Sequence, residues 1–276
     1  ADLDPRQDII VSTKVGRLLA PTPDDDLSVP RHGFVSPQPF EPVFDYTYDG
    51  VMRSYESSLQ RLRRSRIDIL LAHDLGRVTH GAEHERHWRD FLNGGYRAMR
   101  ELRDGGAVGA IGLGVNEWEI CEAALAEGEF DCFLLAGRYT LLEQSALDRF
   151  LPLCAARGVS LILGGPFNSG ILAAGVKGAG PFHYNYEAAP PEIVTRVARI
   201  EKLCDDFGVP LAAAALQFPL AHPQSSAVIP GIADPRQARQ AAEWLRTPIS
   251  AAFWDALRGA GLLHPAAPTP TGASIK

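Results

Sequence analysis

Short, continuously apolar segments recur along the chain, each bounded by polar or glycine-rich residues. The clearest holds Ile67, Ile69, Leu70 and Leu71 and ends on His73 and Asp74. It shows no strict alternation of polar and apolar positions, which indicates that both faces are buried. Such a run is typical of a strand inside a parallel sheet covered by helices.

Five further segments have the same character, and stretches with helical periodicity lie between them. Strands are predicted at 8–15, 67–73, 110–116, 132–139, 160–167 and 227–231. Helices are predicted near 49–64, 95–105, 117–126, 146–157, 191–207, 210–221, 234–245 and 251–262, and a polar loop at 76–89. Strict alternation of strand and helix is typical of a mostly parallel α/β sheet.

The number of strands bears on the architecture. A (β/α)₈ TIM barrel closes with eight strands, whereas six leave open edges. The sequence therefore predicts an N-terminally truncated barrel in which about six of eight strands are present. This domain spans residues 1–264, and a Pro/Thr-rich flexible tail follows at 265–276.

One connection inside this domain, residues 18–47, is unusually long. Its prolines, the acidic run Asp24–Asp26 and several aromatic residues interrupt the alternating pattern. Long connections in compact domains often serve as lids over a site, so a lid is predicted. A mobile insertion without such a role stays open as the alternative.

Composition restricts the kind of partner. The chain has 276 residues, 46% hydrophobic and 22% charged, with a formal net charge of −6. The acidic balance argues against nucleic acid and anionic membranes as partners. No apolar run approaches the roughly 20 residues of a membrane span, and no signal-peptide pattern opens the chain. A cytoplasmic protein that binds a small molecule is predicted, as a monomer or homodimer.

The cysteines and the clustered histidines give little sign of metal chemistry. Four cysteines lie mostly in apolar stretches without C-x-x-C spacing, which predicts reduced core thiols. His80, His84 and His87 have a spacing that suits a metal site on a helix. Nothing around them reads as a buried site, so no metal is predicted.

Titratable residues stand at the ends of two predicted strands. His73 and Asp74 end one strand, and Lys14 ends the first. In a barrel the carboxyl ends of the strands carry the catalytic groups. A hydrolase using His73 and Asp74 as acid and base, and a purely structural histidine, both remain open on this evidence.

Several motifs occur together in a particular order: S-T-K, L-L-A-H, I-G-L-G-V-N-E-W, R-Y-T-L-L-E, G-G-P-F-N-S-G-I-L and V-I-P-G. In this order they resemble the third to eighth barrel strands of the aldo-keto reductase superfamily. The segments F-E-P-V-F-D-Y and L-A-G-R-Y-T-L-L-E-Q resemble its D-threo-aldose 1-dehydrogenase branch (L-fucose, D-arabinose and galactose dehydrogenases), with pyridoxal 4-dehydrogenase near it.

The resemblance implies an NAD(P)-dependent oxidoreductase with a catalytic Asp, Tyr, Lys and His. Lys14 matches the lysine and His73 the histidine, whereas the Asp and the Tyr belong to units that this chain lacks. A phenol needs an adjacent ammonium to act as an acid–base group near neutral pH. The chain as printed is therefore expected to be inactive.

The resemblance also implies a cofactor site without a Rossmann fingerprint. The loop after the seventh barrel strand would hold the pyrophosphate, and Asn116 takes the place of a serine that binds the carboxamide. Gly231 replaces a lysine common in NADPH-dependent members, and Gln237 sits near their phosphate-binding arginine. NAD is therefore favoured, with NADP possible because Arg236 is close by. The implied loop residues are Gly165, Phe167, Gly170 and Leu172.

The implied substrate is an aldose, oxidised at C1 to its lactone. Phe40 and Phe44 of the lid, and Trp118, would contact it through their rings. A pyridoxal 4-dehydrogenase-type activity and a general aldehyde reductase are the alternatives. An inactive NAD(P)-binding barrel is an alternative of another class.

Overall fold

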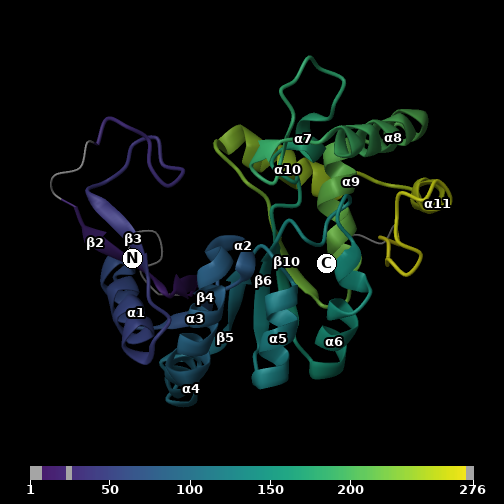
Figure 1. The fold of residues 1–276 in the computed structure, drawn as a ribbon. Coiled ribbons are helices and arrows are strands. Elements are labelled where there is room, and N and C mark those ends of the chain that lie inside the picture. Colours follow the sequence, from purple (N-terminus) through teal and green to yellow (C-terminus); the bar gives the residue numbers. More distant parts are fainter. Residues whose placement is uncertain (1–7, 23–26, 272–276) are drawn as a thin grey trace. The chain divides into compact units, whose positions relative to one another are not determined.

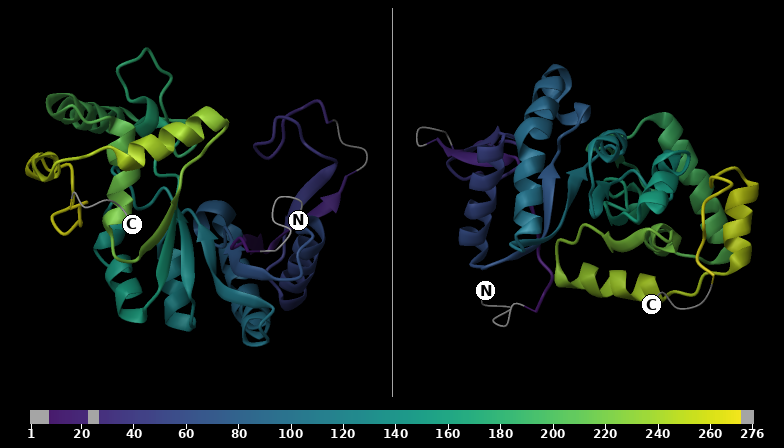
Figure 2. Two further views of the ribbon diagram at one scale, coloured as in Figure 1. Left: turned by 180° about the vertical axis from the view of Figure 1, so that it is seen from behind. Right: turned by 90° about the horizontal axis from the view of Figure 1, so that it is seen from below.

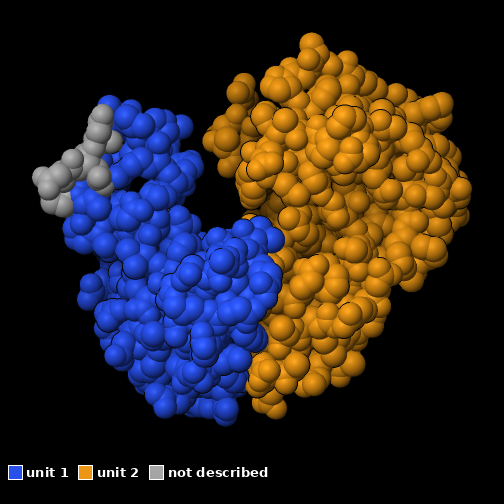
Figure 3. Space-filling model, in the orientation of Figure 1, with its two compact units in different colours: residues 1–114 blue, residues 115–276 orange. Residues whose placement is uncertain are grey.

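The computed structural model describes residues 8–22 and 27–271. Its contacts divide the chain into two compact units, residues 1–114 and residues 115–276 (Figure 3). The prediction that residues 1–264 form a single barrel domain stays a prediction.

The first unit is built on three parallel strands: β1 (Ser12–Val15), β4 (Ile67–His73) and β5 (Val108–Val115), of which all but the last residue belong to this unit. Two helices, α1 (Tyr48–Leu62) and α4 (Tyr96–Asp104), pack against each other, and α1 packs on β1 (Figure 1). Thr47 caps α1 by accepting a hydrogen bond from the N–H of Gly50, as expected for a threonine at this position.

The segment after β4 is helical, so the predicted polar loop at 76–89 is wrong. It contains α2 (Arg77–His80), the 3₁₀ turn η1 (Gly81–Glu83) and α3 (His84–Asp90), and a π-helical turn η2 (Phe91–Gly95) joins α3 to α4. His84, His87 and Phe91 are buried. Their spacing of three and four residues forms one inward helix face, which the polar character of histidine concealed in the sequence.

The long connection contains a two-stranded antiparallel sheet that the sequence did not predict. Its strands are β2 (Arg17–Pro21) and β3 (Phe40–Phe44), with Leu18 opposite Val43. The acidic residues at 24–26 lie outside the described residues. The lid role of this segment stays a prediction.

The second unit holds three more parallel strands, β6 (Cys132–Ala136), β7 (Ser160–Gly164) and β10 (Ser225–Ile229). Its helices are α5 (Glu119–Glu127), α6 (Phe150–Arg157), α7 (Ile171–Ala174), α8 (Pro191–Phe207), α9 (Leu211–Gln217), α10 (Pro235–Arg246) and α11 (Ala251–Gly259) (Figure 2). Two 3₁₀ turns, η3 (Ser145–Leu147) and η4 (Phe218–Ala221), and a small hairpin of β8 (His183–Tyr184) and β9 (Glu187–Ala188) complete it.

Residues 8–22 and 27–271 thus hold six parallel strands that alternate with helices. This confirms the predicted α/β class and the number of barrel strands. Of the predicted flexible tail, residues 272–276 lie outside the described part. Ala267, nearer its start, is buried, and its carbonyl accepts a hydrogen bond from Arg258.

The four cysteines are free and buried, as predicted from their apolar surroundings. Burial raises the pKa of the Cys132 thiol to about 11 and raises those of Cys154 and Cys204 to about 12. Because the thiolate is the reactive form, these thiols are structural.

Two features that would point to other functions are absent from the described residues. None of the helices there combines the length and the apolar character needed to span a bilayer. In the same part of the chain, no group of three or more His, Cys, Asp or Glu side chains is arranged to hold a metal ion.

Candidate functional site

Lys14 and His73 lie on adjacent parallel strands of the first unit. Lys14 is paired in register with Leu71, two residues before His73, so all three side chains point to the same side of the sheet. A Cβ built on Gly114 of β5 would lie only 2.8 Å from Cε of Lys14. Since Gly114 is also the register partner of His73, the lysine chain extends toward the strand end where His73 stands.

Two contacts fix the strand end at His73. The hydroxyl of Tyr46 donates a 2.6 Å hydrogen bond to the carbonyl oxygen of His73, and Tyr46 is completely buried. The Nε2 atom of His73 lies 3.1 Å from Oδ2 of Asp74. Asp74 itself has a φ of 48°, in the left-handed region, and its N–H bonds to the carbonyl of Gly114 at 2.9 Å. No pattern in the sequence pointed to Tyr46 as a neighbour of this strand end.

His73 also lines a cavity of about 390 Å³ within the first unit. Phe40 lines the same cavity, as do Arg17 and Phe34. Phe44 is not among the lining residues. Its ring instead packs edge-on against His80, with centroids 4.6 Å apart, and Arg17 lies over it at 5.7 Å.

Two of the histidines after β4, His80 and His87, belong to an aromatic cluster. The rings of His80 and His87 are 4.2 Å apart, and Nε2 of His80 lies 2.9 Å from the hydroxyl of Tyr46. Burial, with a contribution from the charge of His87, lowers the pKa of His80 to about 4. Burial also lowers the pKa of His87. Both imidazoles are therefore neutral near pH 7.

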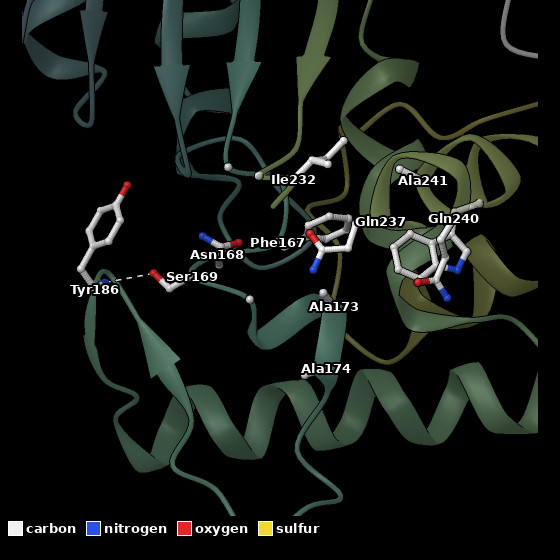
Figure 4. A pocket seen from close by; sticks show the side chains of 14 residues that line it. Phe167, Asn168, Ser169, Ala173, Ala174, Tyr186, Ile232, Gln237, Gln240 and Ala241 are labelled. Atoms are coloured by element: carbon white, nitrogen blue, oxygen red, sulfur yellow. Dashed lines mark hydrogen bonds between the residues drawn. The ribbon is translucent and has the colours of Figure 1, made fainter. Parts of the chain in front are cut away.

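A larger cavity, of about 590 Å³, lies within the second unit (Figure 4). The loop after β7 forms one wall, and the segment after β10 together with α10 forms another. Five of the residues predicted from the sequence line it: Gly165, Phe167, Gly170, Gly231 and Gln237.

The inward face of α10 adds residues that sequence reasoning missed. Gln240, Ala241 and Trp244 line the cavity along with Gln237, and Trp244 packs edge-on against Phe167 at 5.9 Å. These positions follow the i, i+3, i+4, i+7 spacing of one helix face. Their spacing from Gln237 is the sequence signal that could have identified them. Asn168, Ser169 and Tyr186 were missed as well.

Three residues predicted to bind the cofactor, and Trp118, which was predicted to contact the substrate, are not among those that line this cavity. Leu172 is fully buried and bonds through its N–H to the carbonyl of Phe167. The side chain of Arg236 is 86% exposed, and its guanidinium lies 3.4 Å from the carboxylate of Asp234. Asn116 follows β5, and the Trp118 indole donates to the hydroxyl of Ser145 at 3.4 Å.

The cavity suits a nucleotide. Its volume is in the range of small-molecule and cofactor sites. Its walls combine aromatic and aliphatic side chains with glycine-rich backbone that a ligand can approach closely. None of its described lining residues carries a charged side chain.

Comparisons with known proteins bear on the family to which this chain belongs. The model of the Aldo/keto reductase family matches residues 2–261. The chain is similar to a pyridoxal 4-dehydrogenase from Microbacterium luteolum, with 47% identity over 92% of this chain and 76% of that protein. It is also similar to a D-threo-aldose 1-dehydrogenase from a Pseudomonas species, with 37% identity over 96% of this chain and 78% of that protein.

Among solved structures, the chain resembles the holo form of the aldo-keto reductase AKR11C1 from Bacillus halodurans. The TM-score is 0.69 at 21% identity, covering 95% of this chain and 75% of that one. The chain therefore belongs to the aldo/keto reductase family and has its fold. It is an oxidoreductase that works with a nicotinamide cofactor, and this membership argues against the hydrolase alternative.

Proposed function

We propose that the chain is an NAD-dependent dehydrogenase that oxidises a pyridoxal-type compound or an aldose. The observation that carries this proposal is the convergence of Lys14 and His73 on Gly114 at the carboxyl ends of adjacent strands. This geometry suits a reaction in which a hydroxyl loses a proton while its carbon loses a hydride.

The chain's own residues have distinct parts in this proposal. The Lys14 ammonium would stabilise the phenolate of the family's catalytic tyrosine, which the added units supply in the extended form tested below. The His73 imidazole would orient the reacting oxygen. Tyr46 and Asp74 hold His73 in place through its carbonyl and its ring. A bound nicotinamide dinucleotide supplies the hydride acceptor.

The uncharged walls of the second-unit cavity favour NAD over NADP. A 2′-phosphate needs cationic partners, and the described lining residues include no lysine or arginine. The N-terminus of α10, where an anion could bind, is already capped by Asp234. Its carboxylate accepts hydrogen bonds from the N–H groups of Arg236 and Gln237, at 2.7 and 3.0 Å.

The choice of substrate rests on similarity. The pyridoxal 4-dehydrogenase is more similar to this chain than the D-threo-aldose 1-dehydrogenase is, which favours a pyridoxal-type substrate. Oxidation of an aldose at C1 to a lactone is the second candidate. The cavity beside His73, with Phe40 in its wall, is the proposed substrate site. A cytoplasmic location and a monomeric or homodimeric state stay predictions.

NADH formation at 340 nm tests the proposal, with NAD and either pyridoxal or L-fucose as substrates. The printed chain is compared with a form extended at residue 1 by the first two βα units of a family member. We expect the extended form to turn over pyridoxal. In that form, Lys14→Met should lower kcat by at least about 100-fold. The matched control is Lys202→Met, because Lys202 is an exposed lysine paired with Asp206.

Two results would contradict the proposal. One is the absence of NAD-dependent turnover of either substrate by the extended form. The other is turnover that is equally affected by Lys14→Met and by Lys202→Met.

A further inference from the structure

The loop after β7 has an unusual backbone. Three successive residues, Asn168, Ser169 and Gly170, have φ values of 44°, 59° and 93°. The first two are not glycine, and a left-handed conformation is unfavourable for such residues unless their surroundings impose it. Because all three line the second-unit cavity, this strained segment forms part of the proposed cofactor site (Figure 4).

A buried hydrogen-bond network holds the segment in this conformation. The hydroxyl of Thr140 donates to Oδ1 of Asn168 at 2.6 Å, and Nδ2 of Asn168 donates to the carbonyl of Gly137 at 3.2 Å. Thr140 is 1% exposed and Asn168 is 3% exposed. Water therefore cannot readily replace either partner.

The direction of the Thr140 proton is fixed by its other contacts. Its oxygen accepts hydrogen bonds from the N–H groups of Leu142 and Glu143, at 3.2 and 3.0 Å. A hydroxyl has one proton and two lone pairs. Because both lone pairs accept these hydrogen bonds, the proton is donated to Oδ1 of Asn168. At the other end, the N–H of Gly137 bonds to the carbonyl of Gly164 at the end of β7, at 2.9 Å. The network thus ties the strained segment to the ends of two strands.

We propose that Thr140 is a positioning residue for cofactor binding, which rests on the function proposed above. Thr140 is not among the residues that line the cavity, so it acts through Asn168. It keeps the backbone at 168–170 in the conformation that receives the cofactor, and binding then does not have to order this segment. Thr140 was not singled out as a site residue in the sequence.

The dissociation constant of NADH, measured by fluorescence titration of the printed chain, tests this role without requiring turnover. We expect Thr140→Val to raise the Kd about 5- to 10-fold, the loss expected for one neutral hydrogen bond. Thr140→Ser keeps the hydroxyl and should restore a Kd near that of the wild type. Thr195→Val is the matched control, because Thr195 is exposed on helix α8 and its hydroxyl donates to the backbone carbonyl of Pro191.

A double-mutant cycle separates this role from simple stabilisation. Asn168→Gly removes the side chain on which Thr140 acts and suits a φ of 44°. We expect this variant alone to weaken NADH binding. In its background, Thr140→Val should have no further effect on the Kd. The melting temperature of each variant is recorded, since a merely structural role lowers it and leaves the Kd unchanged.

The outcomes are distinct. A Kd that is unchanged in Thr140→Val, or in Asn168→Gly if the valine variant does not fold, overturns the inference. Equal effects of Thr140→Val in both backgrounds also overturn it. If the wild-type chain binds no NADH, the proposed function fails, and the inference fails with it.

Discussion

His80 shows how burial changes the chemistry of a single residue in this protein. Its ring contacts those of Phe44 and His87, and its Nε2 atom lies 2.9 Å from the Tyr46 hydroxyl. Because burial lowers the pKa of His80 to about 4, the folded protein resists protonation there. Tyr46 in turn bonds to the carbonyl of His73, so this cluster supports the backbone of a proposed catalytic residue.

The pKa of His80 predicts a pH dependence of stability. Below about pH 6.5 the unfolded chain binds a proton at His80 that the folded chain does not bind until about pH 4. The contribution of neutral His80 is therefore complete above about pH 6.5 and is lost as the pH falls toward 4. The free-energy difference between the wild type and His80→Gln, from urea unfolding, should decrease from about pH 7 to about pH 4.5.

The variant His183→Gln, which removes an exposed histidine of β8, is the control for this experiment. A difference between wild type and His80→Gln that stays constant over the same pH range would refute the prediction.

Individual site residues differ in how well the sequence reveals them. Lys14 and His73 were predictable because a polar residue that ends a buried strand stands out from its apolar neighbours. Thr140 and Asn168 were not, since their hydrogen bond joins residues 28 positions apart and follows no periodic pattern. Tyr46 was hidden for the same reason, because its partner His73 lies 27 positions away.

At the scale of elements, α10 determines what the second-unit cavity accepts. Its inward face presents Gln237, Gln240 and Trp244, while Asp234 caps its N-terminus. The helix offers amides and an aromatic ring to a ligand, and the exposed Arg236 lies beside Asp234. This arrangement leaves the cavity wall without a cation for a 2′-phosphate.

Adding cations on this wall should change the cofactor preference. The double variant Gly231→Lys and Gln237→Arg should lower the Kd of NADPH relative to that of NADH by about tenfold or more, since charged groups form stronger hydrogen bonds to phosphate. Fluorescence titration with both cofactors measures the ratio. Ala238→Arg is the control, because this exposed position of α10 does not line the cavity. An equal gain from the control would show that net charge alone was responsible.

The helices and strands themselves were largely predictable. The continuous apolar runs located all six parallel strands, and helix α8 begins and ends where the pattern predicted. The hairpin of β2 and β3 was missed because prolines and exposed apolar residues such as Leu19 and Val43 obscure any alternation. The helices at 77–90 were missed because their buried face carries histidines instead of aliphatic residues.

For the whole molecule, cofactor binding and folding are linked. A ligand that binds only the folded chain stabilises it by an amount set by its concentration relative to the Kd. The proposed cofactor cavity is formed by the segments that follow β7 and β10 and by α7 and α10, which are far apart in the sequence. A ligand bound there contacts segments that separate when the second unit unfolds.

NADH should therefore raise the melting temperature. At a concentration about 100 times the Kd the expected stabilisation is about 2.7 kcal/mol, which corresponds to an increase of about 5–10 °C for a chain of this size. Differential scanning fluorimetry over a series of NADH concentrations measures it. Thr140→Val should show a smaller increase at the same concentration. A melting temperature that does not change with NADH would contradict the proposed cofactor site.

The two groups of proposed site residues occupy separate stretches of the chain. Lys14 and His73 lie in the first unit, whereas the residues that line the larger cavity lie between Gly165 and Trp244. Random mutations made in residues 1–276 of the extended form should therefore separate by codon position. Clones that keep nucleotide affinity but lose turnover would carry changes around the codons for Lys14 and His73. Clones with weak nucleotide affinity would carry changes between the codons for Gly165 and Trp244.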